Sequence, residues 1–90
     1  MQVNIKYKKR VRKLAKELYG KPYSKRFQEF LDELNVKNRN KQLHSAEFIR
    51  QCFNTERQTL DTYIVLFHKR LIKEKKEHEA KIKKLEQSII

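Results

Sequence analysis

The sequence predicts a small all-α domain of about four helices, the last of which is extended. Apolar residues recur at helical spacing in most segments, and the chain holds one glycine, one proline and no hairpin dipeptide such as Asn-Gly. A chain of 90 residues forms one small domain that has little room for a deep active-site cavity. The single cysteine cannot form an internal disulfide. We therefore expect a helical binding protein and no enzyme.

The first predicted helix has an apolar face at the i, i+4, i+7, i+8 and i+11 spacing: Tyr7, Val11, Leu14, Ala15 and Leu18. Gly20 can adopt the left-handed conformation that ends a helix, and Pro22 prevents continuation. Ser24 offers an N-cap for a second helix. That helix carries the stripe Phe27, Phe30, Leu31 and Leu34, and the polar residues 37–41 predict the loop that follows it.

Ser45 is expected to cap a short third helix, whose apolar residues are Ala46, Ile49, Cys52 and Phe53. Asn54 tolerates a left-handed turn, so we expect the helix to end there. Thr55 and Gln58 form a capping box, which predicts the start of a fourth helix. Its apolar positions are Leu60, Tyr63, Ile64, Phe67 and Leu71.

No stop signal follows, so the fourth helix is expected to continue through a Lys/Glu-rich segment. We divide the chain into a basic helical domain, residues 1–70, and a C-terminal helix, residues 71–90, that could associate with another copy. The residues expected to mediate this association share one heptad seam: Leu71, Ile82, Leu85 and Ile89. Lys75 and His78 interrupt that seam, which predicts a weak homodimer.

The formal net charge of +12 is unevenly distributed. Residues 1–26 hold ten Lys/Arg and one Glu, whereas residues 27–68 hold five Lys/Arg and six Asp/Glu. This segregation favours an electrostatic contact surface near the N-terminus and a polyanionic partner, nucleic acid before membrane. The basic residues of the first helix include Lys8, and those expected to contact phosphates there are Lys9, Arg10, Arg12 and Lys13.

Residues 45–64, SAEFIRQCFNTERQTLDTYI, resemble the helix-turn-helix of bacterial and phage DNA-binding proteins. Ile49 and Phe53 stand where that family has the apolar residues of its first helix. Leu60, with Ile64 or Tyr63, stands where the recognition helix packs back. The resemblance implies a DNA-binding domain that regulates transcription or handles the DNA of a mobile element.

In such a domain the start of the recognition helix enters the major groove. Arg57 can bond a guanine edge, Gln58 an adenine edge, and Thr62 a phosphate or a thymine methyl group. Lys41 and Arg50 are further candidates for phosphate contacts. Phosphates would repel Glu56 and Asp61, so these carboxylates are turned aside, accept from cytosine, or keep the helix out of DNA.

Other chemistry has little support in the sequence. The histidines and Cys52 lack the close spacing of a metal site, and no glycine-rich phosphate loop exists, so we expect no metal and no cofactor. No segment has the apolar length of a membrane span, and the location expected is intracellular, in the cytoplasm or nucleoid of a bacterium or archaeon or in an infected host cell. Two alternatives to DNA binding stay open. One is a small interaction factor or viral inhibitor that acts on an acidic protein or a nucleic-acid enzyme, and the other is an RNA-binding protein.

Overall fold

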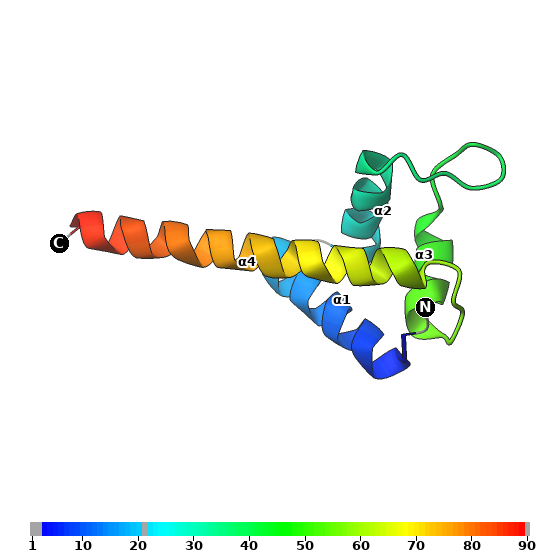
Figure 1. Ribbon diagram of the computed structural model, residues 1–90, viewed down its shortest axis with the longest axis horizontal. Helices are drawn as coiled ribbons and strands as arrows, with labels where there is room; N and C mark the ends of the chain where they lie inside the picture. Colours follow the sequence, from blue (N-terminus) through cyan, green and yellow to red (C-terminus); the bar gives the residue numbers. More distant parts are fainter. Residues whose placement is uncertain (1–2, 21, 90) are drawn as a thin grey trace.

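The computed structural model describes residues 3–20 and 22–89 and confirms the all-α class. Its four helices are α1 (Ile5–Tyr19), α2 (Tyr23–Glu33), α3 (Ala46–Asn54) and α4 (Asp61–Ile89), and the described residues contain no strand (Figure 1). None of these helices is both long enough and apolar enough to cross a membrane in the described part of the chain.

Both ends of α1 are fixed by local chemistry. The side chain of Asn4 accepts a hydrogen bond of 2.8 Å from the backbone N–H of Tyr7, which satisfies one of the unpaired donors at the helix start. Gly20 has a φ of 62°, and its N–H donates to the carbonyl of Lys16. The predicted left-handed end at Gly20 is confirmed.

Two predicted details of α2 and α3 are wrong. Helix α2 begins at Tyr23, Pro22 occupies the N-cap position without a side-chain cap hydrogen bond, and Ser24 is a buried residue inside the helix. Helix α3 does end at Asn54, as predicted, but Asn54 has no positive φ, so the left-handed turn expected there is wrong and the chain leaves the helix through an extended Thr55. The predicted cap by Ser45 is confirmed, since its hydroxyl accepts from the N–H of Phe48 at 3.1 Å.

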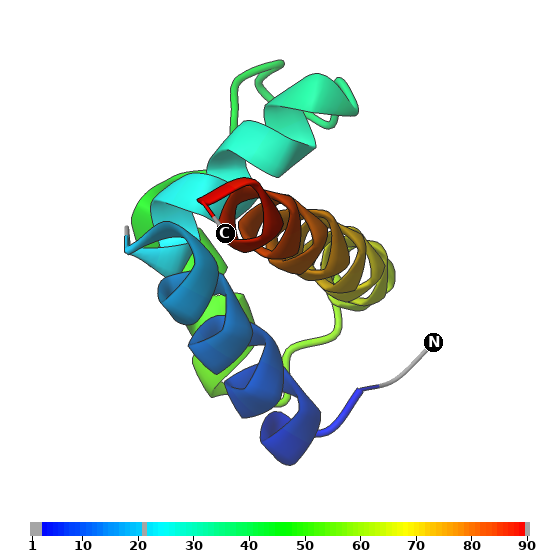
Figure 2. The ribbon, with the colours of Figure 1, turned by 90° about the vertical axis from the view of Figure 1, so that its left-hand side faces the viewer.

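Helix α4 spans 29 residues, which at 1.5 Å per residue gives about 44 Å of a molecule 53 Å long. Helices α1 and α2 lie on different sides of its first half, and α3 packs against α1 and α2 (Figures 1 and 2). We call α1, α2, α3 and residues 61–78 of α4 the head. Residues 79–89, which extend past it, form the overhang.

The core of the head is built from the apolar faces that the sequence predicts. Its aromatic centre is Phe27, whose ring lies 5.0 Å from the rings of both Phe53 and Phe67 in edge-on contact. The other buried core residues are Val11, Ala15, Phe30, Leu31, Ile49, Cys52, Leu60, Ile64 and Leu71. The core therefore joins all four helices.

Candidate nucleic-acid interface

The outer face of α1 carries five exposed cations: Lys6, Lys9, Arg10, Lys13 and Lys16. They lie opposite the buried residues Val11 and Ala15, and we call this surface the basic face. None of the five forms an ion pair with another residue in the described part of the chain, and Glu17 is the one carboxylate of α1. The basic face therefore presents a positive potential along about 15 Å of helix.

The structure places three of the predicted phosphate contacts, Lys9, Arg10 and Lys13, together on this face. Lys6 and Lys16 join them, and neither was among the predicted contacts. The signal for both is in the sequence, because Lys6, Lys9, Lys13 and Lys16 follow the i, i+3, i+7, i+10 spacing of one helix face.

Arg12 lies at the edge of this face, half-buried between α1 and α3. Its guanidinium group donates a hydrogen bond to the side-chain oxygen of Asn54 and lies 5.6 Å from the centre of the Tyr23 ring. These contacts hold the guanidinium in one place, which lowers the entropy that a phosphate contact would have to remove.

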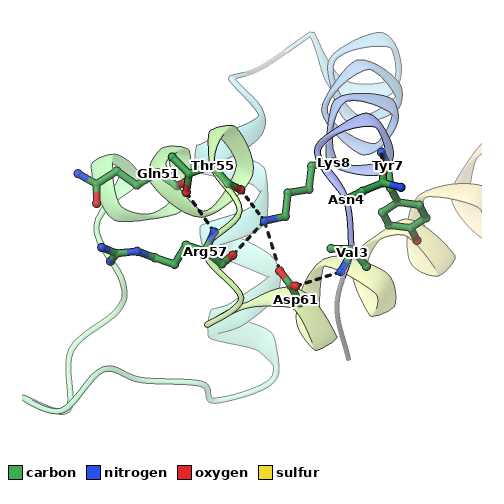
Figure 3. A network of polar contacts seen from close by, with 8 residues as sticks. All are labelled: Val3, Asn4, Tyr7, Lys8, Gln51, Thr55, Arg57 and Asp61. Atoms are coloured by element: carbon green, nitrogen blue, oxygen red, sulfur yellow. Dashed lines mark hydrogen bonds and ion pairs between the residues drawn. The ribbon is translucent and has the colours of Figure 1, made fainter.

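Lys8 does not belong to the basic face, although the sequence groups it with the basic residues of the first helix. Its side chain is fully buried and its ammonium group donates to the carbonyl oxygens of Thr55 and Arg57 at 2.8 and 2.9 Å (Figure 3). The same nitrogen lies 3.4 Å from a carboxylate oxygen of Asp61. Lys8 is therefore a buried residue that links α1 to the α3–α4 connection through hydrogen bonds.

Asp61 is turned away from solvent, which resolves one of the predicted conflicts with DNA. It is 1% exposed, pairs with Lys8 and accepts from the N–H of Val3 at 3.1 Å. Glu56, the other carboxylate of this segment, is exposed. The fold therefore neutralises the charge of Asp61 and leaves that of Glu56 exposed.

The predicted capping box of Thr55 and Gln58 is wrong, because α4 begins at Asp61. Residues 55–60 form an irregular connection, in which the hydroxyl of Thr55 donates to the carbonyl of Gln51 at 2.6 Å and accepts from the N–H of Arg57 at 3.2 Å. Thr55 thus caps the end of α3 instead of the start of α4. The carbonyls of the connection are held by Lys8, a long-range contact that outweighs the local helix signal.

The predicted base-contacting residues consequently occupy two different elements. Arg57 and Gln58 are exposed in the connection, where the guanidinium of Arg57 lies 5.4 Å from the centre of the Phe48 ring. Thr62 is exposed in the first turn of α4. The three side chains therefore do not form the start of one recognition helix.

Lys41 and Arg50 are exposed but belong to other elements than the basic face. Lys41 lies in the α2–α3 loop with a φ of 59°, and Arg50 is on the solvent side of α3. In Figure 1 this loop lies on the far side of α2 and α3 from α1. The structure does not bring the predicted phosphate contacts together on a single surface.

Of the residues predicted to mediate association, one is buried in the head and two are exposed on the overhang. Leu71 is fully buried in the core of the head, so it is no contact residue for a second copy, contrary to the prediction. Ile82 and Leu85 are 42% and 63% exposed on the overhang. The side chain of Ile89 lies outside the described residues.

In the described residues, no group of three or more His, Cys, Asp and Glu side chains is placed to hold a metal ion. Cys52 is buried, and burial raises the pKa of its thiol, against the opposing effect of Arg57 and Lys8.

Comparison with protein-family models, with curated protein sequences and with solved structures finds no match for this chain.

Proposed function

We propose that this protein binds the phosphate backbone of duplex DNA through the basic face of α1. The observation that supports this proposal is the set of five exposed cations on one helix face without carboxylate partners in the described part of the chain. Cations in such a row displace condensed counterions when they meet phosphates, and this release drives binding that is independent of base sequence.

The geometry favours backbone binding, of the kind that an architectural protein makes, over sequence reading. Arg57 and Gln58 extend from an irregular connection, whereas base-reading side chains are usually held by a helix or a strand in the major groove. Discrimination between DNA sequences is therefore expected to be small. Arg57→Ala tests the alternative, since a base contact would contribute about 1–3 kcal/mol of discrimination.

Salt-dependent binding of labelled duplex DNA, followed by fluorescence anisotropy, tests the proposal. If all five cations contact phosphates, the log–log slope of affinity against salt is about −4.5. The triple variant Lys9→Ala/Arg10→Ala/Lys13→Ala should make the slope less steep by roughly 2.7. Its matched control removes the same charge from exposed positions of α4: Lys76→Ala/Lys83→Ala/Lys84→Ala.

The control is expected to keep most of the slope, because its cations lie on another part of the molecule. Equal loss in both variants would mean that net charge alone attracts DNA, and the basic face would then have no special role. A wild-type slope corresponding to fewer than about two phosphates would also contradict the proposal.

We further propose that two copies associate through the overhang, and that the two α4 helices run antiparallel. Ile82 and Leu85 continue the face that Ile64, Phe67 and Leu71 present to the core. The head already covers this face before the overhang begins, so a parallel partner helix would collide with it. An antiparallel partner overlaps only the overhang, along about 16 Å, and its own head then lies beyond the end of the first helix.

In this antiparallel arrangement Ile82 of one copy faces Leu85 of the other, and Glu79 faces Glu86 at the edge of the seam. The apolar contact is short and the facing carboxylates repel each other. The association should therefore be weak, and DNA that binds both basic faces would strengthen it by raising the local concentration.

A further inference from the structure

A second surface feature lies between α2 and α4, away from the basic face. It is a groove of about 300 Å³ whose apolar lining consists of Phe30, Leu34 and Leu66. Leu34 is 43% exposed although it continues the apolar stripe of α2, and Leu66 is 41% exposed although it lies beside the apolar stripe of α4. The groove thus offers apolar surface that the fold itself does not cover.

The rest of the groove lining is cationic: Lys69, Arg70 and Lys73 from one side of α4. Arg70 is fixed by an ion pair of 3.1 Å with Glu33, and its guanidinium lies 5.5 Å from the centre of the Phe30 ring. Lys69 and Lys73 are exposed and form no ion pair within residues 3–20 and 22–89. Lys69 and Lys73 therefore remain available beside the apolar residues of the groove.

We infer that this groove docks an acidic amphipathic helix of another protein. Apolar side chains of such a helix would cover Leu34 and Leu66, and its carboxylates would meet Lys69 and Lys73, which is the usual pattern of helix-in-groove recognition. A nucleic acid would meet the two cations but leave the leucines uncovered. A second copy of this chain, with its net charge of +12, would bring like charge to the rim.

The groove and the basic face are separate surfaces. Figures 1 and 2 show α2 and α1 on different sides of α4, so a partner helix in the groove leaves α1 open. The inference does not depend on DNA binding, and the protein could link a nucleic acid to an acidic protein.

Binding of a defined probe tests this inference. The probe is a short synthetic peptide with leucine at i, i+3, i+4 and i+7 of a helix and glutamate at the other positions, labelled for fluorescence anisotropy. A second peptide with lysine in place of glutamate serves as the charge control. The full chain should bind the acidic peptide in a saturable manner, and the resonances of Leu34 and Leu66 should shift on binding.

The variant Lys69→Glu/Lys73→Glu should weaken binding of the acidic peptide by at least about tenfold, and Leu66→Ser should also weaken it. The matched control Lys76→Glu/Lys83→Glu changes the same charge on exposed residues that do not line the groove, and it should keep nearly full affinity. All of these variants should keep most of the salt dependence of duplex DNA binding, because the basic face is unchanged in each of them.

Three outcomes would overturn the inference. The first is the absence of saturable binding of the acidic peptide, and the second is an equal loss in the groove variant and its control, which would indicate attraction by net charge alone. The third is displacement of the peptide by duplex DNA together with resonance shifts at Lys69 and Lys73, which would make the groove part of a nucleic-acid surface.

Discussion

Replacing Lys8 by methionine is expected to destabilise the head strongly, because Lys8 is the one fully buried lysine among the described residues. Methionine keeps most of the aliphatic volume but removes the ammonium group. The carbonyls of Thr55 and Arg57 then lose the donor that Lys8 supplies, and the carboxylate of Asp61 loses its cationic partner and keeps only the hydrogen bond from the N–H of Val3.

Removal of one partner from a buried ion pair costs about 3–5 kcal/mol, since the other charge stays buried without its counter-charge. A domain of this size has a total stability of roughly 5–15 kcal/mol, so the loss is a large part of it. Urea unfolding followed by helical circular dichroism measures the difference, with the neighbouring Lys9→Met as control. Lys9 is exposed, and its substitution should change stability by less than about 0.5 kcal/mol.

The double variant Lys8→Met/Asp61→Leu separates the charge effect from the packing effect. It removes the unpaired carboxylate, so its loss should be smaller than the sum of the two single losses by more than about 1 kcal/mol. A Lys8→Met protein within about 1 kcal/mol of the wild type would refute the reasoning, because Lys8 would then be hydrated in solution.

Two further predictions concern pH and association. A hydrogen bond of 2.7 Å joins Nδ1 of His68 to the hydroxyl of Tyr7, and the pKa of His68 is lowered by burial and, to a lesser degree, by Arg10. His68 therefore binds a proton less readily in the folded state than in the unfolded chain, and the free energy of unfolding should fall as pH decreases from about 7 through the ordinary histidine range near 6.5 and below. In His68→Gln the urea midpoint should depend less on pH over that range. A pH dependence equal to that of the wild type would contradict the assignment. For the overhang, Leu85→Asp should abolish the association measured by sedimentation. Glu86→Lys should strengthen an antiparallel pair, in which residue 86 faces Glu79, and should weaken a parallel pair, in which it faces Lys81. A wild-type chain that stays monomeric at high concentration, or a weaker association of Glu86→Lys, would exclude the antiparallel dimer.

The sequence alone was sufficient for the features that depend on neighbours along the chain. The helical class, the end of α1 at Gly20, the cap at Ser45 and the uninterrupted C-terminal helix follow from spacing and from the local chemistry of single residues. The cations Lys9, Arg10 and Lys13 share one exposed face for the same reason, since helical periodicity fixes which side chains point together.

The tertiary structure decided the features that depend on residues far apart in the chain. Lys8 has the i, i+3, i+7 spacing with Val11 and Ala15 that marks the buried face, but its partners lie 47 and 49 residues away, and a lysine at such a position is usually solvated. Because these contacts hold residues 55–60 as an irregular connection, α4 begins at Asp61 despite the capping signal at Thr55. Leu71 and Leu85 occupy equivalent positions in the heptad pattern, and only the position at which the head ends makes one a core residue and leaves the other exposed.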